Sequence, residues 1–207
     1  MGNGKIFYII GKSASGKDKL YHMLTTDETL GLAEIVSYTT RPIREKETNG
    51  VEYNFVSEEE LDALEKEGRV IEKRAYDTVQ GIWYYATVDD GSVDVKSRPY
   101  ISIGTLESYI KMRDYYGNDV VEPLYIDTED SIRLGRAIKR EKKQANPDYK
   151  EVCRRFLADS EDFSAEKIKE AGIKRVFENN EELDTVFNAL KSHVGSVIID
   201  VYGNNQI

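Results

Sequence analysis

The stretch "KIFYIIGKSASGKDKL", residues 5 to 20, decides the fold. Its first part is a short continuous apolar run, as in a strand buried on both faces, and "KDKLYHMLTT" after the glycines has helical spacing. Between them, Gly11, Gly16 and Lys17 match the pattern G-x-x-x-x-G-K of a phosphate-binding loop. Strand, loop and helix follow one another in the order that such a loop requires. The next position is Ser or Thr in that pattern, but here it is Asp18.

This loop predicts a binding site for the phosphates of ATP. Glycines let the backbone approach a polyphosphate, the N–H groups and the helix N-terminus supply positive potential, and Lys17 adds a mobile charge. Asp18 has two interpretations: its carboxylate helps to hold Mg²⁺, the expected cofactor, or it is an acid favoured by the helix dipole. The residues expected to bind the ATP phosphates are Gly11, Ser13, Ala14, Ser15, Gly16, Lys17 and Asp18.

Composition limits the partners and the cellular location that we expect. The chain has 207 residues, a net charge of -9 and one cysteine, Cys153, which excludes an internal disulfide framework. No apolar run approaches the roughly 20 residues of a membrane helix. We therefore expect a cytoplasmic protein, a monomer or a homodimer, that binds neither nucleic acid nor membranes.

Strands that alternate with helices along the chain predict one α/β domain with a parallel, doubly wound sheet. Strands are expected at residues 33–38, 50–56, 69–77, 82–88, 99–104, 120–127 and 174–180. Helices are expected at residues 57–68, 105–116, 128–143, 151–163 and 181–193. The hairpin-rich part predicts an inserted subdomain with a mixed sheet. The expected division is a core at about 1–35, 97–130 and 150–195, an insertion at 36–96, a helical lid at 131–150 and an unassigned tail at 195–207.

Two segments in the expected insertion carry a resemblance to a known family. "SYTTRPIR", residues 37 to 44, and "NGVEYNFV", residues 49 to 56, resemble the nucleoside-monophosphate-binding segment of guanylate kinases, a family of P-loop kinases. The resemblance implies phosphorylation of GMP and dGMP by ATP and Mg²⁺, to give GDP and dGDP. It also implies that GMP is bound by Ser37, Arg41, Arg44, Tyr53, Glu72, Tyr85 and Thr87.

General chemistry agrees with these implied roles. Guanidinium groups bind phosphate through two hydrogen bonds, and a phenol adds a neutral donor. A carboxylate such as that of Glu72 can accept from both N1–H and the exocyclic amine of guanine, whereas adenine has an acceptor at N1.

A basic segment, "IRLGRAIKREKK" at residues 132 to 143, stands out in this acidic chain. Arg136 and Arg140 are four residues apart and share a helix face, and Arg155 belongs to the next helix. The resemblance implies a lid that brings these arginines to the transferring phosphoryl group, so we expect them to be catalytic together with Lys17. The alternative is a solvated basic helix face.

The resemblance weakens in the strand "YISIG", residues 100 to 104. Guanylate kinases usually carry two aspartates there, where this chain has Ser102 and Gly104. We hypothesise that Asp18 supplies the missing carboxylate near the metal. Two alternatives remain at this stage: a kinase for another nucleotide or a sugar phosphate, and a binding module that has lost catalysis. The retained Lys17, Arg41 and Arg44 favour an enzyme.

Overall fold

The computed structural model describes residues 4–78 and 81–203. Its larger sheet is entirely parallel, with the strand order β2-β7-β1-β8-β9. These strands are β1 (Ile6–Ile10), β2 (Ala33–Glu34), β7 (Tyr100–Gly104), β8 (Val121–Asp127) and β9 (Val176–Glu178). The central strand β1 is buried at every residue, as its continuous apolar sequence predicts. The α/β class and the parallel sheet are confirmed.

Helices cover both faces of this sheet. On one face, α1 (Lys17–Thr25) and α7 (Leu183–Tyr202) pack with Phe7 and Ile9 of β1. On the other face, α3 (Leu106–Tyr116) packs with Ile6, Tyr8 and Ile10, and α6 (Ala165–Glu170) lies beyond it. The alternation of side chains along β1 therefore supplies two separate cores.

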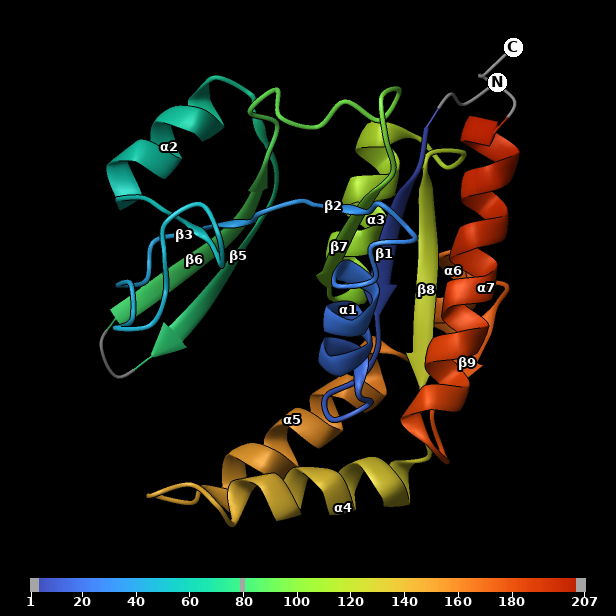
Figure 1. The fold of residues 1–207 in the computed structure, drawn as a ribbon. Helices are drawn as coiled ribbons and strands as arrows, with labels where there is room; N and C mark the ends of the chain where they lie inside the picture. Colours follow the sequence, from blue (N-terminus) through green and yellow to red (C-terminus); the bar gives the residue numbers. More distant parts are fainter. Residues whose placement is uncertain (1–3, 79–80, 204–207) are drawn as a thin grey trace.

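A second, four-stranded sheet lies apart from the first, with the order β4-β3-β6-β5 (Figure 1). Its strands are β3 (Tyr38–Thr39), β4 (Asn54–Phe55), β5 (Val70–Thr78) and β6 (Gly81–Val88). β3 pairs with β4 in parallel and with β6 in antiparallel register, so this sheet is mixed. Helix α2 (Glu58–Lys66) begins at a capping box, in which both the Ser57 and the Glu60 hydrogen bonds are present, and Gly68 follows with a φ of +74°.

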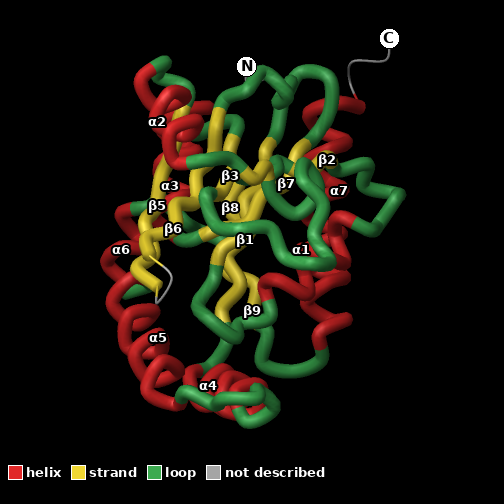
Figure 2. The backbone as a smooth tube through the Cα atoms, turned by 90° about the vertical axis from the view of Figure 1, so that its left-hand side faces the viewer, coloured by secondary structure: helices red, strands yellow, loops and turns green. Residues whose placement is uncertain are grey.

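Two helices lie below the carboxyl ends of the main-sheet strands in Figure 1. They are α4 (Asp130–Glu141) and α5 (Tyr149–Asp162), and they lie together at the same end of the molecule in the view turned by 90° (Figure 2). The phosphate-binding loop follows β1, at the same end of the main sheet as these helices. Nothing in the described ranges, 4–78 and 81–203, is a helix long and apolar enough to cross a membrane.

The structure corrects three expectations about secondary structure. The single strand expected at residues 33–38 is divided, because the chain passes from β2 in the main sheet to β3 in the second sheet. The strand expected at 50–56 is only β4, since residues 50–52 form a turn. The last helix does not end at residue 193 but continues to Tyr202, so it includes most of the segment that had no assignment. The turn expected between β5 and β6 includes residues 79 and 80, which lie outside the described residues.

Candidate active site

A cavity of about 950 Å³ lies between the phosphate-binding loop and the second sheet. The loop and α1 contribute Gly11, Ser13, Lys17 and Asp18. The second sheet and the chain leading to it contribute Ser37, Tyr53, Arg74, Tyr76, Trp83 and Tyr85, and β7 contributes Ser102 and Gly104. Arg155 and Asp159 approach from α5. The two sheets and α5 therefore surround one continuous space.

The loop itself has the backbone conformation that its glycines allow. Gly16 has a φ of +92°, and Ala14, with a φ of +63°, is the non-glycine residue with positive φ among the described residues. A Cβ atom at Gly16 would lie 2.4 Å from Nδ2 of Asn179, and one at Gly11 would lie 2.5 Å from the carbonyl oxygen of Ile126. Both glycines are required by close packing.

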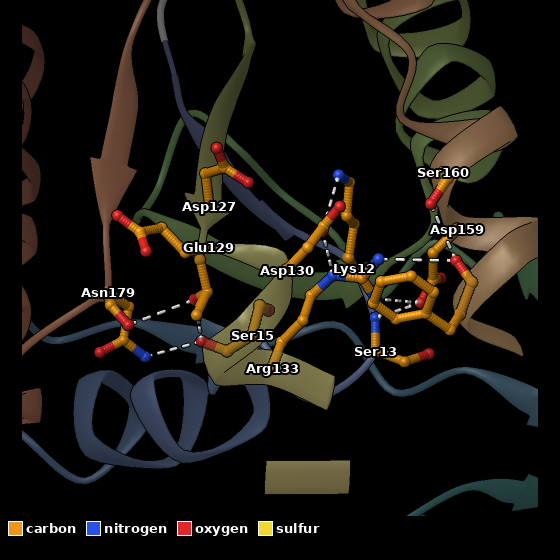
Figure 3. A network of polar contacts seen from close by, with 12 residues as sticks. Lys12, Ser13, Ser15, Asp127, Glu129, Asp130, Arg133, Asp159, Ser160 and Asn179 are labelled. Atoms are coloured by element: carbon orange, nitrogen blue, oxygen red, sulfur yellow. Dashed lines mark hydrogen bonds and ion pairs between the residues drawn. The ribbon is translucent and has the colours of Figure 1, made fainter. Parts of the chain in front are cut away.

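Asn179, just beyond β9, holds the loop from behind (Figure 3). Its Nδ2 donates to the carbonyl oxygen of Ser15 at 2.6 Å, and the Thr128 hydroxyl donates to the same oxygen at 3.1 Å. In the described part of the chain, the buried Ser15 Oγ and Asn179 Oδ1 have no hydrogen-bond partner. The sequence alone did not identify Asn179, because its role depends on a contact across 164 residues.

Lys17 and Asp18 begin α1 at the wall of the cavity. Nζ of Lys17 lies 3.7 Å from Oδ2 of Asp18, whose side chain is 77% exposed. Within the described ranges no group of three or more His, Cys, Asp or Glu side chains could hold a metal ion alone. A single accessible carboxylate suits Mg²⁺, which is commonly held by one or two carboxylates together with substrate phosphates and water.

A carboxylate from α5 contacts the loop directly (Figure 3). Oδ2 of Asp159 accepts a hydrogen bond from the backbone N–H of Ser13 at 2.8 Å and is 3.2 Å from Nη1 of Arg133. The Arg133 side chain is 1% exposed, is also 2.8 Å from Oδ1 of Asp130, and lies 4.0 Å from the ring centroid of Phe156. This network joins α4, α5 and the loop. The sequence did not predict this network, because nothing distinguishes Arg133 from the other basic residues of the segment 132–143.

Arg41 is buried and already paired in this structure. Its Nη1 and Nη2 donate to the two carboxylate oxygens of Glu47 at 2.8 and 2.6 Å, and its guanidinium lies 5.1 Å from the ring centroid of Tyr53. The hydrogen bond from Arg41 lowers the pKa of Glu47 to about 2. The backbone N–H of Arg44 also donates to Glu47, at 2.9 Å, while the Arg44 side chain is exposed. Neither arginine is among the residues that line the cavity in the described chain.

Tyrosines face the cavity beside this pair. The rings of Tyr53 and Tyr85 are in edge contact with centroids 5.6 Å apart, and Tyr76 contacts Tyr85 in the same manner at 5.3 Å. Burial raises the pKa of Tyr53, so its phenol remains a neutral donor at neutral pH. Ser37 lies on the cavity wall where the chain enters the second sheet.

Glu72 and Thr87 are brought together but lie behind another residue. The Thr87 hydroxyl donates to Oε1 of Glu72 at 2.9 Å, and the Glu72 side chain is only 3% exposed. Nε and Nη2 of Arg74 donate to the two oxygens of Glu72 at 2.9 and 3.2 Å. Arg74 lines the cavity, whereas neither Glu72 nor Thr87 does so in the described chain. Arg74 had not been identified from the sequence, although the two-residue period of a strand puts it on the same face as Glu72.

The three arginines expected in the lid take different positions. Arg136 donates through Nη2 to the carbonyl oxygen of Asn179 at 3.2 Å. Arg155 lines the main cavity and is 3.1 Å from Glu151. Arg140 and Arg155 also meet at a smaller cavity between α4 and α5, so two of the arginines already share one space.

At Gly104, one of the two positions where guanylate kinases usually carry aspartate, the space for a side chain is occupied by the phenol of Tyr8. A Cβ atom at Gly104 would lie 2.4 Å from the hydroxyl of Tyr8 and 2.4 Å from Oγ of Ser108, which are hydrogen-bonded to each other at 2.9 Å. Ser102 is buried beside them. A carboxylate at position 104 is therefore incompatible with this packing.

Comparisons with known proteins agree with this arrangement. Residues 3–91 match the family described as Guanylate kinase. A guanylate kinase of Neisseria gonorrhoeae is 43% identical over 88 residues, which are 42% of this chain and 40% of that protein. One from Malacoplasma penetrans is 42% identical over 69 residues, which are 33% of this chain and 35% of that protein. These alignments span less than half the length of the relatives.

The fold comparison extends over the rest of the chain. The crystal structure of guanylate kinase from Anaplasma phagocytophilum matches 96% of this chain and 88% of its own, with a TM-score of 0.58 and 20% identity, and it therefore shows the fold. Residues 3–91 are therefore similar in sequence to guanylate kinases, and the chain has the fold of a guanylate kinase structure.

Proposed function

We propose that the protein is a nucleoside monophosphate kinase that transfers the terminal phosphoryl group of ATP to GMP or dGMP. The observation that carries the proposal is the single cavity of about 950 Å³ that joins Lys17 to Tyr53 and Tyr85. In-line transfer requires the donor and acceptor phosphates in one space, from which water is excluded on closure. A cavity shared by a phosphate-binding loop and a second sheet meets that requirement. The products are ADP and GDP or dGDP.

The donor side is formed by the loop and the first turn of α1. Backbone N–H groups of residues 13–18 surround the phosphates of ATP, and Lys17 neutralises charge on the β and γ phosphates. Asp18 is the proposed protein ligand of Mg²⁺, which would supply positive charge beside the phosphates of ATP. Asn179 contributes indirectly, because it fixes the backbone of the loop at Ser15.

The lid is proposed to consist of α4, α5 and their connection. Its closure brings Arg136, Arg140 and Arg155 to the transferring phosphoryl group, where fixed positive charge stabilises the transition state. The Asp159 carboxylate must leave the Ser13 N–H during this motion, since a γ-phosphate near the loop would repel it. Arg133 is suited to hold the displaced carboxylate, because it already pairs with it.

The acceptor phosphate is proposed to bind to Arg41, Arg44, Tyr53 and Tyr85. Arg41 exchanges the carboxylate of Glu47 for the phosphate, which offers the same bidentate geometry. Ser37 is proposed to face the base, and Glu72 and Thr87 lie at the same end of the site, behind Arg74. No general base is required, because the oxygen of the acceptor phosphate is already a nucleophile.

The proposed substrates are ATP and GMP, and the proposed location is the cytoplasm. A net charge of -9 disfavours nonspecific binding to nucleic acid or to an anionic membrane. We keep a monomer or a homodimer as the expected state, which size-exclusion chromatography with light scattering determines directly.

The test is production of ADP from ATP and Mg²⁺ with GMP, dGMP, AMP, CMP and UMP compared in parallel. The proposal predicts turnover that depends on GMP or dGMP and on Mg²⁺. Absence of turnover with every nucleoside monophosphate would reject it. The variant Tyr53→Phe provides a check on the acceptor site, because loss of one phosphate donor should raise KM for GMP and leave KM for ATP nearly unchanged.

A further inference from the structure

Arg74 lines the cavity and is paired with the Glu72 carboxylate, which does not line it in the described chain. Three of about four lone-pair positions on Glu72 are used, two by the Arg74 fork and one by Thr87. Recognition of guanine by one carboxylate needs two of them, for N1–H and for the exocyclic amine. As arranged here, Glu72 cannot accept both hydrogen bonds.

Arg74 presents hydrogen-bond donors to the cavity. Arg74 uses Nε and one N–H of Nη2 on Glu72, which leaves the outer fork of Nη1 and Nη2. Within the residues that the structure describes, Nη1 of Arg74 has no hydrogen-bond partner, and the side chain lines the cavity while remaining only 20% exposed. Glu72 fixes the direction of this fork, as a carboxylate commonly does for an arginine that binds a ligand.

The residues beside Arg74 on β6 and across the cavity on β7 are aromatic or uncharged. Residues opposite one another on β5 and β6 form rows on the cavity face, with Arg74 opposite Tyr85 and Tyr76 opposite Trp83. Across the cavity, β7 contributes Ser102 and Gly104, neither of which is charged, and Tyr8 excludes a carboxylate at position 104. The base end therefore offers a guanidinium fork between aromatic rings.

We propose that Arg74, and not Glu72, determines base specificity, and that the acceptors are 6-oxopurine nucleoside monophosphates, with hypoxanthine accepted as well as guanine. This inference rests on the proposed function. Guanine and hypoxanthine both present O6 and N7 as adjacent acceptors, which an arginine fork matches, whereas adenine replaces O6 by an amine donor. The exocyclic amine that distinguishes guanine from hypoxanthine makes no contact with this fork. Glu72 is a positioning residue that orients Arg74.

The first experiment compares GMP, IMP and AMP with the native protein. The expected kcat/KM values for GMP and IMP agree within about three-fold, and both exceed that for AMP by about ten-fold or more, the range of one bidentate contact to a base. Dissociation constants for the same nucleotides, measured from the fluorescence of Trp83, the one tryptophan of the sequence, give the same ratios without turnover.

Two variants at position 74 test the residue itself. In Arg74→Gln the amide still donates to Glu72 but the fork is lost, so the preference for GMP and IMP over AMP should fall about ten-fold. In Arg74→Ala the Glu72 carboxylate becomes free to accept from guanine, so GMP should become preferred over IMP by about ten-fold. Lys73→Ala is the matched control, because Lys73 is adjacent on β5 but pairs with Asp62 and Glu65 on the opposite side. It should leave all nucleotide ratios unchanged.

A native protein that prefers GMP to IMP by ten-fold or more overturns the inference, because such a preference requires recognition of the exocyclic amine. Equal ratios in the native protein and both Arg74 variants overturn it as well, as does a native protein that binds neither GMP nor IMP. The proposed kinase function is rejected by a different result, namely that no nucleoside monophosphate is phosphorylated. In that case the dissociation constants still decide whether Arg74 selects 6-oxopurines.

Discussion

Replacement of Arg133 by methionine tests the link between the lid helices and the phosphate-binding loop. Methionine replaces the aliphatic stem of the arginine side chain, and it removes the charge and all five N–H donors. The Arg133 side chain is 1% exposed, so water cannot replace the lost contacts. Asp159 would then retain the hydrogen bond from the Ser13 N–H but lose its cation.

The expected cost follows from these contacts. Removal of one partner from a fully buried ion pair costs about 3–5 kcal/mol. Asp159 is 16% exposed and keeps one hydrogen bond, so the lower end of that range applies. The pair with Asp130 adds little, because the Asp130 side chain is 55% exposed. We expect Arg133→Met to lower the free energy of unfolding by about 3 kcal/mol, which corresponds to a decrease in Tm of about 6–12 °C for a chain of this size.

Urea and thermal unfolding, followed by circular dichroism, measure this change. Arg154→Met is the matched control, because Arg154 belongs to α5, the helix of Asp159, and pairs with Glu151 at 2.7 Å but is 66% exposed. Its effect should be below about 1 kcal/mol. A loss below 1 kcal/mol for Arg133→Met as well would refute the reasoning, since the network would then contribute no more than an exposed pair.

Three further predictions follow from the site. Asp18→Ala should reduce kcat and raise the Mg²⁺ concentration needed for half-maximal activity, and an unchanged Mg²⁺ titration would show that Asp18 is not a metal ligand. Gly16→Ala should abolish ATP binding in an equilibrium titration, because its φ is +92° and the new methyl group would collide with Asn179; binding at native strength would contradict this. Arg41 lowers the pKa of Glu47 from 4.5 to about 2. The ionised Glu47 therefore stabilises the fold fully above pH 4.5, and this stabilisation is lost as the pH falls to about 2. Glu47→Gln should therefore remove part of the acid dependence of unfolding in that interval, and identical acid profiles would exclude the contribution.

The sequence predicted those parts of the fold in which local pattern and tertiary packing agree. The apolar strand, the glycines and the following helix specify the loop, and the capping box at Ser57 specifies the start of α2. The segment at 33–38 was misjudged because six consecutive residues suited to a strand contain no signal for the change of sheet. The end of α7 was misjudged because the tail from residue 195 was left unassigned, although Gly195 is tolerated within a helix that packs beside Leu30.

The candidate site was predicted less completely than the fold. Gly11, Lys17 and Tyr53 follow motifs with fixed spacing, and they line the cavity. Arg74 has no motif, and its importance arises from the pairing with Glu72 and from the packing of Tyr8 against Gly104. Asn179 contacts Ser15 across 164 residues of sequence, and this contact cannot be inferred from a local pattern.

The most direct measurement of the central claim is the stoichiometry of products, followed by ³¹P NMR with ATP, Mg²⁺ and GMP, for the native protein and for Lys17→Ala. The account predicts that the native protein forms ADP and GDP in equal amounts without inorganic phosphate. It also predicts that Lys17→Ala, which lacks the mobile charge of the loop, forms neither at a comparable rate. Release of ADP and inorganic phosphate without GDP, or equal rates for the two proteins, would contradict phosphoryl transfer within this cavity.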